Sequence, residues 1–224
     1  MIDAKTGFLA LLGYPVGHSL SPIIHNAALK AANLNYVYLA LSVKPEDLPP
    51  AFTGLCKIGC SGLNITIPHK ETIIPLLDEI EETARLIGSV NTVCFREGKS
   101  IGYSTDGRGF LMDLQEKGIS PAGKKVLMIG AGGAAVSVAA ELYKAGIARL
   151  VVLNRHPEMA ERMLAKIAAI KNIPSDFGEL NARSSRHIHD ADIVIQTTPV
   201  GMEPHHDESP WLDPEPFHEG QIVY

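Results

Sequence analysis

Four short polar segments of the sequence carry side chains that could bind a small ligand and move protons. Each follows an apolar run typical of a strand, and together they span residues 13–22, 64–70, 89–92 and 104–107. In an open α/β sheet, ligands bind where strands end and helices begin. Hydroxyls, amides, a lysine and an aspartate that meet there would suit a small polyhydroxylated acid. The binding candidates are Ser19, Ser21, Asn64, Thr66, Lys70, Asn91 and Asp106.

Each candidate also has a purely structural interpretation. Ser21 could be the N-cap of the helix that follows it. Asn64 and Thr66 share one face of a strand because they are two residues apart, and that face could be solvated. Asp106 could cap a helix, and Lys70 could be a surface cation.

Lys70 and Asp106 are the candidates for proton transfer. Lys70 lies in the first turn after Pro68, directly before the helix expected over 71–77, where the helix dipole disfavours a positive charge. Partial burial would disfavour the charged amine in the same way. A nearby Asp106 carboxylate would oppose this effect and orient the amine. Such a pair could transfer the proton that accompanies a hydride.

A glycine turn in the second half of the sequence indicates a nucleotide site. The apolar run 126–129 ends at Gly130, Gly132 would let backbone N–H groups approach a pyrophosphate, and Ala135 fills the small third position of G-x-G-x-x-G/A. The phosphates would lie on the helix N-terminus. A plain strand–turn–helix is the alternative. The cofactor candidates in this turn are Gly130, Ala131, Gly132, Gly133, Ala134 and Ala135.

The end of the next strand, 149–153, indicates which dinucleotide binds. Asn154 and Arg155 stand where an acidic residue would accept a hydrogen bond from the ribose 2′-OH of NAD. An arginine favours a 2′-phosphate instead. We therefore predict NADP over NAD, with a solvated Arg155 as the alternative interpretation.

Two domains of an α/β fold are expected to position these segments. The predicted strands of the first half are 8–12, 36–43, 63–67, 90–95 and 101–104, with a hairpin at 96–99 and helices at 21–33, 71–77, 82–87 and 107–117. Residues 120–123 resemble a linker. We predict an N-terminal α/β substrate-binding and catalytic domain with a mixed sheet over residues 1–120. A Rossmann-type domain with a doubly wound parallel sheet would bind NADP over residues 121–224.

Composition excludes several classes of protein. Of 224 residues, 46% are hydrophobic and 20% are charged, so a buried core is expected. The net charge is −5 and neither half is basic, which argues against nucleic acid as a partner. The longest charge-free apolar stretch near the glycine turn is shorter than the roughly 20 residues that span a bilayer, so no membrane partner is expected. The 3 cysteines favour a reducing cytoplasm, and neither cysteines nor histidines show a metal-site spacing.

These motifs together resemble those of the shikimate dehydrogenase family, and the resemblance covers essentially the whole sequence. It rests on Gly-Tyr-Pro-Val-Gly-His-Ser-Leu-Ser-Pro (13–22) with His25-Asn26, Asn-Ile-Thr-Ile-Pro-His-Lys (64–70), Gly-Ser-Val-Asn-Thr (88–92), Thr-Asp-Gly (105–107), the glycine turn, Asn154-Arg155 and Thr-Pro-Val-Gly-Met (198–202).

The resemblance implies reduction of 3-dehydroshikimate by NADPH to shikimate, a step of aromatic amino-acid biosynthesis. Ser19 and Ser21 would hold the substrate carboxylate, and Lys70 with Asp106 would form the acid–base pair. The residues implied to bind the ring hydroxyls are Asn64, Thr66, Asn91 and Asp106. For the cofactor, the implied residues are 130–135 for the pyrophosphate, Asn154 and Arg155 for the 2′-phosphate end, and Thr198, Pro199, Gly201 and Met202 near the nicotinamide. Family members are implied to be cytoplasmic, metal-free monomers or homodimers.

The sequence departs from the family at its end. In the family, the strand that 221–224 begins is followed by an Asp-x-x-Tyr turn and by helices that return to the first domain and supply a glutamine. We therefore expect a C-terminally truncated chain that folds but catalyses weakly. Two alternatives stay open: a quinate/shikimate dehydrogenase that uses NAD, and a non-catalytic nucleotide-binding sensor on the same fold. Ser19 argues against the first, because the resemblance implies that a serine at this position is specific for shikimate. Lys70 with Asp106 argues against the second, because a sensor does not need a pair that transfers protons.

Overall fold

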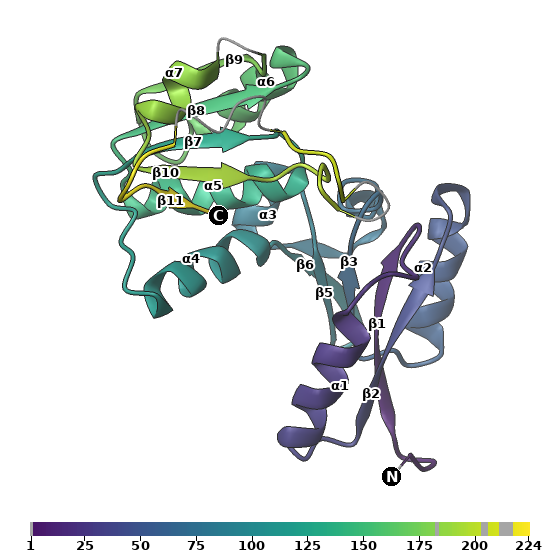
Figure 1. The fold of residues 1–224 in the computed structure, drawn as a ribbon. Helices are drawn as coiled ribbons and strands as arrows, with labels where there is room; N and C mark the ends of the chain where they lie inside the picture. Colours follow the sequence, from purple (N-terminus) through teal and green to yellow (C-terminus); the bar gives the residue numbers. More distant parts are fainter. Residues whose placement is uncertain (1, 182–183, 203–205, 211–216) are drawn as a thin grey trace. The chain divides into compact units, whose positions relative to one another are not determined.

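The chain forms two compact units, Met1–Thr105 and Asp106–Tyr224 (Figure 1). The structure is a computed structural model that describes residues 2–181, 184–202, 206–210 and 217–224. The units divide earlier in the sequence than the boundary expected near residue 120. The reason is helix α4 (Asp106–Glu116), which packs against α5 (Gly133–Ala145) and so belongs to the second unit.

The first unit is built on a mixed sheet with the strand order β2-β1-β3-β5-β6-β4. Strand β1 pairs in parallel with β2 and β3, whereas β5 pairs antiparallel with β3 and β6. The strands are β1 (Gly7–Gly13), β2 (Tyr36–Ser42), β3 (Gly62–Ile65), β4 (Glu79–Ile80), β5 (Thr92–Arg96) and β6 (Lys99–Tyr103). The order and register bring the end of β3, the start of β5 and the end of β6 together, and the polar segments 64–70, 89–92 and 104–107 lie at these points.

Helices cover both faces of this sheet. The helical segments are α1 (Ser21–Ala31), η1 (Pro45–Asp47), α2 (Leu48–Lys57), η2 (Ile74–Leu76) and α3 (Glu82–Ile87). Side chains of β1 alternate between the faces, so Ala10 and Leu12 pack with Phe52 of α2 while Leu11 packs with Tyr38 on the other face. Figure 1 shows α1 and α2 on opposite sides of β1 and β2.

Local predictions for this unit are confirmed in part. The hairpin at 96–99 joins β5 to β6, and Glu97 and Gly98 have positive φ angles of 53° and 77°, as a two-residue type I′ turn requires. The helix expected over 71–77 is wrong. Turns and the short η2 stand there, because Pro75 lacks the N–H that an α-helix interior needs.

The second unit has a parallel sheet with the order β11-β10-β7-β8-β9. Numbered from β7 along the chain, this is the doubly wound order 3-2-1-4-5 from the β9 edge, as predicted. The elements after α4 are β7 (Lys125–Ile129), α5, β8 (Arg149–Asn154), α6 (Pro157–Ile167), β9 (Ser175–Glu179), α7 (Ser185–His189), β10 (Ile193–Gln196) and β11 (Ile222–Val223). Strand β9 is not predicted from the sequence, because this edge strand is polar.

The core of the second unit surrounds β7. Residues 126–129 are at most 2% exposed, and Leu150 and Val152 of β8 are fully buried beside them. Both faces of these strands are covered, which explains their continuous rather than alternating apolar sequence. This core fixes the end of β7, where the glycine turn begins.

Candidate functional site

The glycine turn after β7 has the geometry that a dinucleotide site needs. Gly130 has a φ of 105°, which favours glycine, and its N–H donates to the Leu153 carbonyl oxygen at 2.9 Å. A Cβ at Gly130 would lie 2.5 Å from Thr197 Oγ1, just after β10. Strands β7 and β10 flank the point where the connections of the sheet reverse direction, which is where such sheets bind ligands.

The first turn of α5 fits a pyrophosphate. Gly132 is the N-cap, and a Cβ built there would meet no described protein atom within 4 Å, so a ligand can approach the backbone. The N–H groups of this turn have no helical partner, and the helix dipole favours an anion. Ala135 is fully buried and packs the helix closely on the sheet. Residues 130–135 therefore stay our candidates for the pyrophosphate.

Asn154 and Arg155 follow β8 in the turn that leads into α6. The Asn154 Nδ2 donates to the His156 carbonyl oxygen at 2.9 Å and so fixes the turn. Arg155 is exposed, and no acidic side chain in the described part of the chain forms an ion pair with it. A guanidinium can bind a phosphate through two parallel hydrogen bonds. A contact of Arg155 with a 2′-phosphate stays a prediction.

Gln196 holds the loop after β10, and the sequence analysis missed it. Its Nε2 donates to the Val200 carbonyl oxygen at 2.9 Å, and its Oε1 accepts a hydrogen bond from the Thr198 N–H. The predicted nicotinamide residues that lie in this loop are Thr198, Pro199, Gly201 and Met202. An amide at the end of a buried strand, just before a loop begins, is the sequence signal that could have identified Gln196.

Asn64, Asn91 and two threonines form a hydrogen-bonded cluster in the first unit. The Asn91 Oδ1 accepts from the Thr105 N–H at 2.8 Å and from the Thr92 and Thr105 hydroxyls at 3.1 Å each. The Asn64 Nδ2 lies 3.4 Å from both the Asn91 carbonyl oxygen and Thr92 Oγ1. Protein donors therefore occupy the Oδ1 of Asn91. A ligand contact of this residue would be donated by its Nδ2.

Tyr38 joins this cluster, although the sequence analysis does not select it. Its hydroxyl donates to the Asn64 Oδ1 at 2.7 Å. An aromatic residue within a strand favours a core role, so no sequence signal distinguishes Tyr38 from a packing residue.

Ser19 and Ser21 contact each other at the start of α1. The Ser19 Oγ donates to the Ser21 Oγ at 3.1 Å and accepts from the Ser21 N–H at 3.2 Å. Ser21 is the first helical residue and Leu20 is the N-cap, so the interpretation of Ser21 as the N-cap is wrong. Two hydroxyls at the N-terminal end of a helix are suited to bind a carboxylate.

Backbone hydrogen bonds fix the segment that carries Thr66 and Lys70. The Thr66 N–H donates to β1 at 2.9 Å, and the Lys70 carbonyl oxygen accepts from the Val90 N–H at 2.8 Å. Between them, His69 is fully buried and its Nε2 contacts the Val43 carbonyl oxygen at 2.7 Å. Because only the short η2 follows this segment, the expected effect of a helix dipole on Lys70 is wrong.

Asp106 lies in the other unit, as the first residue of α4. The helix dipole favours a negative charge at this position. The N–H of the next residue, Gly107, donates to the Ser137 Oγ of α5 at 2.9 Å. This contact fixes Asp106 relative to the helix that begins at the glycine turn. The pairing of Lys70 with Asp106 stays a prediction, because the two residues belong to different units.

The described residues hold no group of three or more His, Cys, Asp or Glu side chains that could bind a metal ion. Cys56 and Cys94 are exposed free thiols, and Cys60 is a buried one. Within the same residues, no helix is long and apolar enough to span a membrane.

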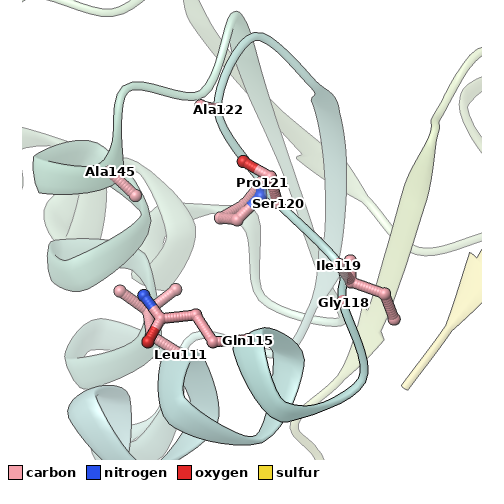
Figure 2. A pocket seen from close by; sticks show the side chains of 8 residues that line it. All are labelled: Leu111, Gln115, Gly118, Ile119, Ser120, Pro121, Ala122 and Ala145. Atoms are coloured by element: carbon pink, nitrogen blue, oxygen red, sulfur yellow. The ribbon is translucent and has the colours of Figure 1, made fainter.

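A pocket at the C-terminal end of α4 lies apart from the glycine turn (Figure 2). Leu111 and Gln115 of α4 line it together with residues 118–122 and Ala145 at the end of α5. No charged side chain is among these lining residues. The pocket therefore offers no group for proton transfer.

Comparisons with known proteins agree with this arrangement. The model of the shikimate dehydrogenase substrate binding domain matches residues 11–93, and that of shikimate / quinate 5-dehydrogenase matches residues 113–202. The shikimate dehydrogenase (NADP+) of Moorella thermoacetica is 47% identical over 227 residues, which cover 100% of this chain and 76% of that protein.

Solved structures are similar along the whole chain. A crystal structure of a shikimate dehydrogenase in complex with NADP+ has a TM-score of 0.91 at 43% identity and covers 100% of this chain and 77% of its own. The quinate dehydrogenase of Corynebacterium glutamicum in complex with NAD has a TM-score of 0.87 at 28% identity, with coverage of 97% and 79%.

Proposed function

The chain belongs to the shikimate dehydrogenase family, and we propose that it interconverts shikimate and 3-dehydroshikimate with NADP as the cofactor. The observation that carries the proposal is the combination of two sites in one chain. One is the glycine turn before α5, and the other is the cluster of hydroxyl and amide side chains at the end of β3, the start of β5 and the end of β6. The Moorella protein and the structure with NADP+ are named shikimate dehydrogenases, which supports the proposal. The alternative with NAD and quinate corresponds to the less similar quinate dehydrogenase.

We assign the substrate contacts from the hydrogen-bonding capacity of each side chain. Ser19 and Ser21 would bind the carboxylate, because the Ser21 hydroxyl and the helix N-terminus can donate to it and the Ser19 hydroxyl can turn from Ser21 toward it. The residues proposed for the ring hydroxyls are Asn64, Thr66, Asn91 and Asp106. For Asn91 the contact would be a donated one, since protein donors occupy its Oδ1.

Lys70 and Asp106 form the proposed acid–base pair. Oxidation of the substrate alcohol to a ketone breaks one O–H and one C–H bond, so the protein must accept the hydroxyl proton. Bound NADP+ would supply the acceptor for the hydride that leaves the carbon. In the opposite direction, Lys70 and Asp106 return a proton to the ketone oxygen.

The residues around the glycine turn would hold the cofactor. Residues 130–135 would bind the pyrophosphate through backbone N–H groups, and Arg155 with Asn154 would bind the 2′-phosphate of NADP. The loop with Thr198, Pro199, Gly201 and Met202 would lie at the nicotinamide, held by Gln196. The weak turnover expected from the sequence stays a prediction.

Steady-state turnover of shikimate with NADP+ tests this function. We expect NADPH to form only when both are present, and Lys70→Ala to lower kcat by at least about 100-fold, as is typical when a general acid–base is lost. Lys57→Ala is the matched control, because Lys57 is an exposed lysine at the end of α2.

Two results would contradict the proposal. Equal rates for Lys70→Ala and the parent chain would remove Lys70 from catalysis. The nucleotide-binding sensor would be favoured if NADP+ binds but shikimate is not turned over, in an assay sensitive enough to detect about one turnover per hour. A higher kcat/KM with quinate and NAD+ would favour the other alternative.

A further inference from the structure

Tyr38 reaches across the sheet of the first unit to one of the proposed substrate residues. It lies in the edge strand β2, and its hydroxyl donates to the Asn64 Oδ1 on β3 at 2.7 Å. The intervening strand β1 contributes Leu11, which packs with Tyr38. The phenol is therefore the group that occupies the acceptor atom of the Asn64 amide.

Three contacts from α1 hold Tyr38 in this position. The Asn26 Oδ1 accepts from the Tyr38 N–H and its Nδ2 donates to the Tyr38 carbonyl oxygen, both at 2.9 Å. The His25 ring stacks on the Tyr38 ring at 4.2 Å with an interplanar angle of 13°. Since α1 begins with Ser21, one helix carries a proposed carboxylate-binding residue and also fixes the tyrosine.

The phenol of Tyr38 is buried and is in its protonated, donor form at neutral pH. Tyr38 is 3% exposed, and the resulting desolvation raises the pKa of Tyr38 to about 12. A protonated phenol can donate one hydrogen bond, and the Asn64 Oδ1 accepts it. The same bond defines the orientation of the amide, because a rotation by half a turn would replace the acceptor Oδ1 with the donor Nδ2.

Among the described residues, the Nδ2 end of the Asn64 amide makes only long contacts. The Asn64 Nδ2 lies 3.4 Å from the Asn91 carbonyl oxygen and 3.4 Å from Thr92 Oγ1. Both distances are at the weak end for an N–H···O hydrogen bond. The Nδ2 can therefore exchange either contact for a better acceptor, such as a ligand hydroxyl oxygen.

We propose that Tyr38 is a positioning residue that fixes the Asn64 amide with its Nδ2 as the donor to a ring hydroxyl of the substrate. This inference rests on the proposed function of the polar cluster. Through one hydrogen bond, a residue of the edge strand β2 would thus take part in recognition of the substrate hydroxyl. Without the phenol, the amide loses its fixed orientation and its Oδ1 loses a donor.

A double-mutant cycle between Tyr38 and Asn64 tests the proposal. Tyr38→Phe should lower kcat/KM for shikimate by about five- to tenfold, which corresponds to one hydrogen bond, and should do so through KM. The KM for NADP+ should not change. In an Asn64→Ala background, Tyr38→Phe should change kcat/KM by less than about twofold, because its effect passes through the amide.

Tyr36→Phe is the matched control. Tyr36 lies two residues away in the same strand, is 40% exposed, and forms no hydrogen bond through its hydroxyl among the described residues. Its loss should leave every kinetic constant unchanged. A full effect of Tyr38→Phe in the Asn64→Ala background would overturn the proposal, because a general loss of packing would produce that result.

A measurement without substrate keeps this inference separate from the proposed function. In an ¹⁵N correlation spectrum, the Asn64 side-chain amide signals are assigned by their loss in Asn64→Ala. Tyr38→Phe should shift these signals, and Tyr36→Phe should not. Unshifted signals would overturn the positioning role even if the enzyme turns over shikimate. Shifted signals without any turnover in the parent chain would support the positioning and contradict the proposed function.

Discussion

The contact of α4 with α5 at Gly107 allows a paired prediction with a built-in control. A Cβ built at Gly107 would lie 2.6 Å from the Ser137 carbonyl carbon and 3.0 Å from the Glu141 Cγ. The first neighbour is backbone inside α5 and cannot rotate away. Gly109, two residues along α4, would place its Cβ within 4 Å of no described atom. The same substitution should therefore have opposite effects at the two positions.

The magnitudes follow from three contributions. Glycine to alanine within a helix stabilises by about 0.5–1 kcal/mol when the new methyl group meets nothing, which is the expectation for Gly109→Ala. At Gly107, overpacking against a fixed backbone costs about 1–3 kcal/mol. Displacement of α4 also weakens the hydrogen bond from the Gly107 N–H to Ser137 Oγ, at about 1 kcal/mol. Gly107→Ala should therefore destabilise the unit by about 1–3 kcal/mol.

Thermal unfolding of the two variants and the parent chain measures the difference. About 1 kcal/mol corresponds to roughly 2–4 °C in a chain of 224 residues and to somewhat more if the second unit unfolds by itself, so the two midpoints should lie on opposite sides of the parent value. Gly107→Ala should also lower kcat, because Asp106 precedes it, whereas Gly109→Ala should not. If both variants raised the midpoint, or if Gly107→Ala left it unchanged, α4 would not approach α5 as closely as described.

Two further substitutions test separate features of the chain. Arg155→Ala should raise the KM for NADP+ by about 10- to 100-fold, because charge-assisted hydrogen bonds are lost, and should leave the KM for NAD+ unchanged. The control Arg162→Ala on α6 should change neither KM. Equal effects on both cofactors would refute a 2′-phosphate contact. Hydrogen bonds from the Ser100 N–H and hydroxyl lower the pKa of the Asp78 carboxyl below its ordinary value of 3.8, so ionised Asp78 favours the folded state. The difference in unfolding midpoint between the parent and Asp78→Ala should therefore be constant from neutral pH to about 4 and shrink below it. A difference that grows on acidification would contradict the lowered pKa.

Features that depend on neighbouring residues could be predicted from the sequence. The glycine turn follows from an apolar strand that ends in Gly130, and Gly98 marks the hairpin between β5 and β6. Both conformations arise within a few residues, where backbone freedom decides the structure. The fold class and the family follow from such motifs in combination.

Features that depend on strand order could not be predicted. Tyr38 meets Asn64 only because β1 lies between β2 and β3, and nothing near either residue in the sequence encodes that order. The helix expected over 71–77 does not form because Pro75 lies within it, although this proline is visible in the sequence. The boundary near residue 120 is displaced because the apolar face of α4 packs on α5, a tertiary contact that outweighs the linker composition of 120–123.

The most direct test of the account is a crystal structure of the chain with shikimate and NADP+ bound. We predict the shikimate carboxylate against the Ser19 and Ser21 hydroxyls, its oxidised hydroxyl within hydrogen-bond distance of Lys70 and Asp106, and the 2′-phosphate against Arg155. Shikimate bound away from Lys70, or a dinucleotide bound away from the turn at 130–135, would contradict it.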